Sequence, residues 1–205
     1  MTHITIRQAA EQDLPAIMEI IRAVFRSDEE IGICQTAGSA SGHPHDQGNS
    51  VHPHDQDPDS CPENDDAEEG LTEAENVVRT QIEGHGFVYL AECDGRIVGC
   101  QSVHIPDEGE ENLGREADLP EKELSRTAHM QPAAVLPEYR GYGIQRMMLM
   151  EAEKELKRRG YHYAAAAIPV KDAFSMENYL QLGYLISAEK RGSGENMNRV
   201  LLRHL

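Results

Sequence analysis

Residues 135–145 read Val-Leu-Pro-Glu-Tyr-Arg-Gly-Tyr-Gly-Ile-Gln, and this stretch decides the fold of the chain. An apolar run over 128–136 stops at Pro137, and a helical pattern begins after the second glycine. The stretch therefore predicts a strand, a glycine-rich turn and a helix. Glycines let a ligand approach the backbone, and the first N–H groups of a helix have no partner inside it. The turn is either an anion site at a helix start or only a tight connection.

The helix that follows is predicted from near Gly143 to Gly160. Apolar residues recur in it at four-residue intervals, which gives it one apolar face. Basic residues fill its last turn, where they meet the negative end of the helix dipole, and Gly160 can end it. The apolar residues are Ile144, Met148, Ala152 and Leu156, and the basic ones are Lys157, Arg158 and Arg159.

The remaining elements follow from alternation, helical spacing and turn residues. Asp13 is a candidate N-cap of the first helix, and Asp94-Gly95 is a hairpin signal. Strands and helices interleave, so the expected class is α/β, with a mixed central sheet and helices on both faces. A length of 205 residues fits a single domain, 1–205. Further strands are predicted at 2–7, 86–92, 96–105, 162–168, 184–188 and 198–202, and further helices at 13–25, 71–84, 120–126 and 172–182.

The formal net charge is −17, but the acidity is concentrated in one segment. Fourteen of the 36 Asp and Glu residues lie between Arg26 and Arg79, where there is no Lys or Arg. Within it, Val51 is the single large aliphatic residue of 35–70, which cannot bury enough apolar surface to become ordered. We expect a disordered, acidic, His/Asp/Pro-rich insertion at 35–70. A chain this acidic is not expected to bind nucleic acid or an anionic membrane.

Metal binding and compartment can also be addressed from the sequence. The His/Asp cluster at 43–55, with Cys61 nearby, either holds Zn or Ni or binds metal weakly and incidentally. It has no fixed ligand spacing and no flanking core, so we expect no metal to be required. The four cysteines form no C-x-x-C pair, the N-terminus has no signal layout, and no apolar run reaches 18 residues. These features predict a reduced, cytoplasmic protein outside the membrane.

Two segments resemble a known family. The pattern Val-x-Pro-x-Tyr-Arg-Gly-x-Gly at 135–143 resembles the acyl-CoA signature of the GNAT superfamily of N-acyltransferases, and 172–184, Asp-x-x-Ser-x-x-x-Tyr-x-x-x-Gly-Tyr, is similar to its second cofactor segment. Residues 111–114, 128–130 and 198–202 look like a little-characterised group of bacterial members. The resemblance implies the GNAT fold, which is of the α+β type with a mixed, mostly antiparallel sheet of about six to seven strands.

The resemblance also implies how acetyl-CoA would be held. Backbone groups of Val135 and Leu136 would bind the pantetheine arm at the splayed end of the strand, and Asp172 and Ser175 would contact the pantetheine or the adenosine side. Two residues depart from the family pattern, because Gln145 replaces the usual Gly or Ala and Asp172 replaces the usual Asn. The pyrophosphate would be held by the main-chain amides of Arg140, Gly141, Tyr142, Gly143, Ile144 and Gln145.

Direct acyl transfer needs a proton donor for the thiolate and a proton acceptor for the amine. The resemblance places Tyr179 near the sulfur as the acid, and the alternative is a tyrosine buried for packing. His129 is the candidate base, since it can titrate near neutral pH and alternation puts it on one face with Gln131, Ala133 and Val135. His129 can equally be structural, and Glu92 or an ordered water chain can serve instead.

We therefore expect a GNAT-type N-acetyltransferase that transfers an acetyl group from acetyl-CoA to a primary amine of a small molecule or peptide. The acidic loop 107–118 either attracts a cationic acceptor or is a solvated loop. One alternative is a GNAT-fold module that binds acyl-CoA without turnover and acts as a sensor or interaction protein. Another is a His-rich metal-handling protein, which accounts for the insertion alone. The oligomeric state, monomer or homodimer, is left open.

Overall fold

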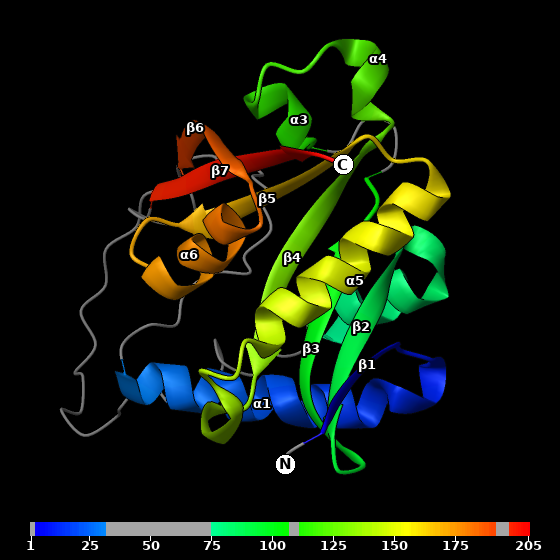
Figure 1. Cartoon of the computed structure of the whole chain (residues 1–205), viewed down its shortest axis with the longest axis vertical. Helices are drawn as coiled ribbons and strands as arrows, with labels where there is room; N and C mark the ends of the chain where they lie inside the picture. Colours follow the sequence, from blue (N-terminus) through cyan, green and yellow to red (C-terminus); the bar gives the residue numbers. More distant parts are fainter. Residues whose placement is uncertain (1–2, 32–74, 107–110, 192–196) are drawn as a thin grey trace, which may run out of the picture.

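The computed structural model describes residues 3–31, 75–106, 111–191 and 197–205. They form one seven-stranded sheet with the strand order β1-β2-β3-β4-β5-β7-β6 (Figure 1). The disordered insertion expected at 35–70 lies outside the described residues. The strands are β1 (Ile4–Gln8), β2 (Gly86–Cys93), β3 (Arg96–His104), β4 (Thr127–Val135), β5 (Tyr163–Pro169), β6 (Leu185–Arg191) and β7 (Met197–His204).

Every neighbouring pair in the sheet is antiparallel except β4 and β5, which are parallel. The prediction of a mixed, mostly antiparallel sheet is therefore confirmed. The predicted hairpin is also confirmed, because Asp94 and Gly95 join β2 to β3 with φ angles of 49° and 81°. Two successive positive φ angles give the turn a twist that matches the strands, and Gly and Asp tolerate them best.

Helices cover both faces of the sheet. They are α1 (Leu14–Ile31), α3 (Leu113–Glu116), α4 (Glu121–Leu124), α5 (Ile144–Arg159) and α6 (Ala173–Gln181), with a helical stretch at 75–80 that runs into the π-turn η2 (Gln81–His85). In Figure 1, α5 crosses the near face over β2, β3 and β4. On that face Phe87, Val103 and Met130 pack with Leu149 of α5, and on the other face Val88 and Leu90 pack with α1.

Asp13 does not cap α1, which corrects the sequence prediction. It is the last residue of the short 3-10 helix η1 (Glu11–Asp13), and its Oδ2 accepts the backbone N–H of Ala10 at 2.8 Å. Both carboxylate oxygens also accept from the guanidinium of Arg7, at 2.7 and 2.8 Å. This bidentate contact lowers the pKa of the largely buried Asp13. Asp13 therefore ties β1 to the start of the first helix.

A β-bulge in β4 changes which side chains share a face. Gln131 and Pro132 lie together opposite Ser102, because Met130 is opposite Val103 whereas Ala133 is opposite Gln101. The bulged carbonyl of Gln131 accepts the Nε2–H of the buried Gln101. Proline has no N–H to donate to a ladder, so a bulge is one of the few places where a sheet accepts it.

Candidate active site

The central feature of the site is the point where β4 and β5 separate. Their parallel pairing covers Thr127 with Tyr163, Ala128 with Ala164 and His129 with Ala165, and it stops there. Beyond it β4 continues to Val135 while β5 turns toward β7 and continues to Pro169 (Figure 1). In a continuous sheet, the backbone groups of β4 beyond His129 would form hydrogen bonds with β5. The fork leaves them without these bonds.

At the open end of the fork, backbone groups on one edge of β4 form hydrogen bonds with β3, and those on the other edge face the fork. The N–H of Leu136 donates to the carbonyl of Val98 at 3.0 Å, so it faces β3. The carbonyl of Val135 instead accepts the Nε–H of Arg140 at 3.2 Å. Because N–H and C=O of one strand residue point to the same side, the N–H of Val135 also faces the fork. Val135 and Leu136 were both predicted to bind the pantetheine arm through their backbone. The backbone groups of Val135 face the fork, whereas the N–H of Leu136 faces β3.

The turn after β4 leads directly into α5. A short 3-10 helix, η3 (Pro137–Tyr139), is followed by Gly141 and Gly143 with φ angles of 85° and 72°. A Cβ added to either glycine would meet no atom within 4 Å, so the space in front of this backbone is open. Gly143 is the N-cap of α5, and no side chain caps the helix. The first N–H groups of α5 are therefore available to an anion, with the positive end of the helix dipole behind them.

The side chain of Gln145 lies against α6 rather than extending along the turn. Its Oε1 accepts from Nδ2 of Asn178 at 2.7 Å, and its Nε2 donates to Oγ of Ser175 at 3.3 Å. Asp172 is the N-cap of α6, since its Oδ1 accepts the N–H of Ser175 at 3.0 Å. The two departures from the family pattern, Gln145 and Asp172, therefore both take part in hydrogen bonds that order the start of α6.

The segments that form the fork, the glycine turn and α5 lie within the part of the sequence that matches a known family. Residues 50–184, more than half of the chain, match the acetyltransferase (GNAT) family. The chain belongs to the GNAT family. GNAT-type N-acetyltransferases use acetyl-CoA as the acyl donor and an amine as the acceptor. No curated protein matches the sequence.

Solved structures of other GNAT proteins share this fold. The N-acetyltransferase from Staphylococcus aureus Mu50 aligns with a TM-score of 0.63 at 16% identity, over 98% of both chains. The PaiA N-acetyltransferase from Thermoplasma acidophilum, solved in complex with coenzyme A, aligns with a TM-score of 0.63 at 16% identity, over 99% of both chains. The ribosomal-protein-alanine N-acetyltransferase from Brucella melitensis aligns with a TM-score of 0.62 at 20% identity, over 98% of this chain and 99% of that one. At these identities the likeness shows the fold alone.

In this GNAT chain Tyr179 is buried. Its side chain is 1% exposed, and its ring packs edge-to-face on Tyr184 with the centroids 4.8 Å apart. Burial raises the pKa of Tyr179 above the ordinary tyrosine value, and the negative charges of Glu153 and Asp172 act in the same direction. The hydroxyl is therefore protonated throughout the neutral range, as it would be in a general acid and equally in a tyrosine buried for packing.

His129 lies at the closed end of the fork, on the face opposite α5. Val135 is opposite Gly99, whose α-carbon faces Ile144 and Met148 of α5, and Met130 also faces α5. Because of the bulge, Met130 and Val135 face the same side although they are five residues apart, and His129 faces the other side. The prediction that His129 shares a face with Ala133 and Val135 is therefore wrong. Simple alternation fails because Gln131 and Pro132 together occupy one register position.

The imidazole of His129 is engaged with the connection before β4. Its Nε2 accepts the backbone N–H of Leu113, the first residue of α3, at 3.1 Å, and its ring lies 6.0 Å from that of His104. An imidazole nitrogen that accepts an N–H has its lone pair occupied, so the proton of neutral His129 is on Nδ1. In this arrangement Nε2 does not accept a proton from an amine.

The other residues suggested for the acceptor side are also engaged. Glu92 accepts the Nε–H of Arg7 at 2.7 Å. Of the acidic loop, 107–110 lies outside the described residues, while Glu111 and Glu116 flank Lys190 of β6 at 3.4 and 3.5 Å. The sequence predicted this segment as a loop and missed α3, which Asn112 caps by accepting the N–H of Gly114.

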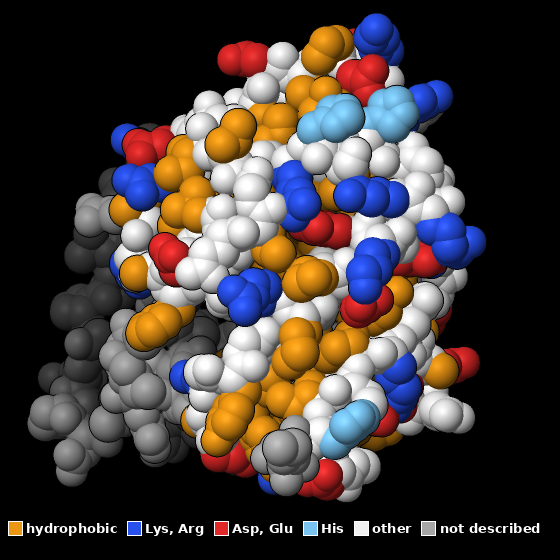
Figure 2. All heavy atoms as spheres, viewed as in Figure 1, with side chains coloured by type: hydrophobic (Ala, Val, Ile, Leu, Met, Phe, Trp, Pro, Cys, Tyr) orange, Lys and Arg blue, Asp and Glu red, His pale blue; other side chains and the backbone are white. Residues whose placement is uncertain are grey.

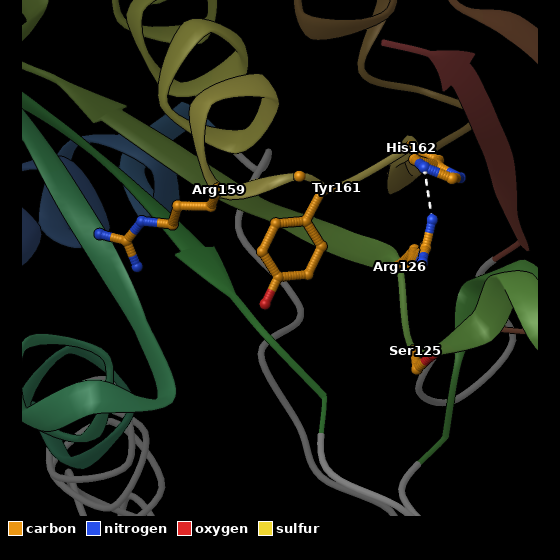
Figure 3. Close-up of a pocket in the computed structure, with 6 residues that line it drawn as sticks. Ser125, Arg126, Arg159, Tyr161 and His162 are labelled. Atoms are coloured by element: carbon orange, nitrogen blue, oxygen red, sulfur yellow. Dashed lines mark hydrogen bonds between the residues drawn. The ribbon is translucent and has the colours of Figure 1, made fainter.

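A hollow at the other end of α5 is shown in Figure 3, and it lies beyond the closed end of the fork. Two of its lining residues bind each other, since Nε2 of His162 meets Nη1 of Arg126 at 2.8 Å. Nδ1 of His162 also meets Oε2 of Glu123, outside the lining, at 2.8 Å. Arg159, from the last turn of α5, pairs with Glu155. The His162 bonds tie the connection between α5 and β5 to α4 and the start of β4, far along the helix from Gly143.

The described part of the chain shows neither a metal cluster nor a membrane-spanning helix. Among residues 3–31, 75–106, 111–191 and 197–205, no group of three or more His, Cys, Asp or Glu side chains is arranged to hold a metal ion. The His/Asp cluster at 43–55 lies outside these ranges. No helix in the same ranges is long and apolar enough to span a membrane.

Proposed function

We propose that this GNAT protein transfers an acetyl group from acetyl-CoA directly to a primary amine of a small molecule or peptide. The observation that carries the proposal is the fork between β4 and β5, which opens beside the uncapped start of α5. A long ligand with a polar amide arm and an anionic end matches these two features placed next to each other. When bound, acetyl-CoA supplies the thioester from which the acetyl group is taken.

The residues of the open turn fit the anionic part of the cofactor. The amides from Arg140 to Gln145 bind the pyrophosphate, and the open space in front of Gly141 and Gly143 admits it. Figure 2 shows Lys and Arg side chains interspersed with hydrophobic and acidic ones on the face that carries α5. That mixed surface supports binding of a polyanion in spite of the strongly acidic net charge of the chain.

The fork fits the pantetheine arm. The N–H and C=O of Val135 face the fork and offer the pantetheine arm one donor and one acceptor. Without the cofactor, the carbonyl accepts the Nε–H of Arg140 instead. Leu136 is not part of this contact, because its N–H donates to Val98 and its carbonyl accepts the N–H of Tyr139. Asp172 and Ser175 act mainly on the protein side, by ordering the start of α6.

Tyr179, which the family resemblance places near the sulfur, donates the proton that the departing thiolate requires, and burial keeps its hydroxyl protonated until then. For the amine proton, the engagement of His129 with Leu113 favours an ordered water chain over the imidazole. His129 instead fixes α3 over the face opposite α5, where the acceptor amine would approach. The acceptor is a primary amine, and the acidic residues of 107–118 favour a cationic one.

The second candidate is a GNAT-fold protein that binds acyl-CoA without turnover and serves as a sensor. It is favoured by the same observation on His129, since a committed Nε2 leaves the base function to water. Thiol release tests the two. Acetyl-CoA is mixed with a panel of polyamines, lysine-like compounds, aminoglycosides and peptides with free N-termini, and free thiol is measured against enzyme-free controls. Amine-dependent release supports the transferase, whereas tight binding of acetyl-CoA without release for any amine supports the sensor.

A further inference from the structure

Gln145 connects the cofactor turn to the helix that carries Tyr179. It is the second residue of α5, beside the open turn, and its side-chain amide bonds to two residues of α6. Both ends of the amide are used: the oxygen accepts from Asn178 and the nitrogen donates to Ser175. A glycine or alanine at this position could form neither bond.

The two partners of Gln145 bracket the turn of α6 that leads into Tyr179. Ser175 is held at its backbone by the N-cap Asp172, and Asn178 directly precedes Tyr179. The carbonyl of Tyr179 accepts the N–H groups of Leu182 and Tyr184 at 3.0 and 3.1 Å, which fixes the end of the same helix. Movement of this turn relative to α5 would therefore displace the Tyr179 ring.

A second bond between the helices lies further from the turn. Nη1 of Arg146 donates to Oε1 of Gln181 at 2.8 Å, and both side chains are exposed. Hydrogen bonds between exposed long side chains contribute little, because water competes for the same groups. The half-buried Gln145 is thus the better placed of the two to fix the distance between the start of α5 and α6.

We infer that Gln145 is a positioning residue, which holds the Tyr179 turn of α6 at a fixed place relative to the pyrophosphate-binding amides. The inference rests on the proposed function for its kinetic consequence, while its structural consequence does not depend on turnover. The Gln145 side chain links the pyrophosphate-binding turn to α6, which carries Tyr179. It therefore fixes the distance between the Tyr179 hydroxyl and the sulfur of a cofactor bound at that turn. Small errors in such a placement reduce the rate of the chemical step more than they reduce binding.

Amide hydrogen exchange on the full chain tests the structural part without a substrate. Gln145→Ala should speed exchange in 175–181 by at least threefold, with 148–156 of α5 unchanged. Gln145→Glu is the conservative control, because a carboxylate can accept from both Asn178 and the Ser175 hydroxyl, and it should exchange as the wild type does. Equal exchange in wild type and Gln145→Ala would overturn the inference, whether or not the protein is an active transferase.

Steady-state kinetics test the positioning part. Gln145→Ala should lower kcat about tenfold with KM for acetyl-CoA within about threefold, and in a Tyr179→Phe background it should lower kcat less than twofold further. Gln145→Glu should show the opposite split, with kcat near wild type and KM raised by its charge beside the phosphates. Gln181→Ala, which removes the exposed link, should match wild type.

The outcomes separate this inference from the proposed function. A wild type that releases no thiol with any amine contradicts the proposed transferase, and hydrogen exchange then decides on Gln145 alone. An active wild type in which the losses from Gln145→Ala and Tyr179→Phe multiply independently overturns the positioning role and leaves the transferase standing.

Discussion

The backbone N–H of Leu113 donates to Nε2 of His129 at 3.1 Å, which joins the connection before β4 to the closed end of the fork. The bond explains why the histidine is buried at 6% exposure beside His104 without being placed to receive a proton. It also links two of the segments, 111–114 and 128–130, by which the sequence resembles one group of GNAT proteins.

His129→Gln should retain kcat within about threefold and leave the pH dependence of kcat unchanged. The amide oxygen of glutamine reaches about as far as Nε2 and can accept the Leu113 N–H, but it cannot act as a base. pH–rate profiles of the two proteins between pH 5.5 and 9 provide the measurement. A fall of about 100-fold with loss of the acidic limb would instead assign the base role to His129.

Tyr179→Phe should lower kcat about 100-fold and change KM for acetyl-CoA little, because the hydroxyl acts on the leaving thiolate and the ring is kept. Tyr184→Phe is the matched control, since its ring packs on that of Tyr179 and the substitution likewise removes one buried hydroxyl, which lies beside Glu153. It should keep kcat within about twofold. An unchanged kcat in Tyr179→Phe would remove the acid assignment.

The wild-type profile should also show no loss of activity from Tyr179 at high pH. Burial raises the pKa of this tyrosine above its ordinary value, so the proton-donating form persists as the pH rises through 9. A basic limb with an apparent pKa near 8 that vanishes in Tyr179→Phe would contradict this.

Asp13→Asn should lower the free energy of unfolding by about 1–3 kcal/mol at pH 7, because Arg7 then loses its charged partner. The folded-state pKa of Asp13 is lowered, so its contribution is present above the unfolded pKa of about 4 and is lost as the pH falls through the folded value. Urea unfolding at pH 7 and at pH 3 measures the difference, which should shrink at pH 3. Glu121→Gln, at the exposed pair with Arg115, should change stability by less than about 0.5 kcal/mol at both.

Local patterns were enough to predict most of the fold. Alternation located the strands, four-residue spacing located α5, and Asp94-Gly95 located the turn between β2 and β3, because each of these depends on neighbours in sequence. The glycine turn was found for the same reason, because Gly141 and Gly143 stand between an apolar run and a helical pattern. The structure adds that both glycines have positive φ angles.

The errors came from contacts between distant segments. Arg7 of β1 binds Glu92 of β2 and also binds the carboxylate of Asp13, which therefore does not cap α1. The α3 helix is too short to show a period, and the bond from Gln145 to α6 joins residues that are 33 apart. The bulge had one visible signal, Pro132 inside a predicted strand, which disagrees with a regular ladder and would have predicted the change of face at His129.

The central claim is that main-chain amides at the start of α5 bind the cofactor's pyrophosphate, and calorimetry with coenzyme A tests it most directly. Gly143→Val is compared with Gly160→Val, because both glycines have positive φ angles and open surroundings but lie at opposite ends of α5. The wild type and Gly160→Val should bind coenzyme A alike, whereas Gly143→Val should bind it at least tenfold more weakly, a difference of about 1.4 kcal/mol. No binding by the wild type, or equal affinities for the two variants, would contradict it.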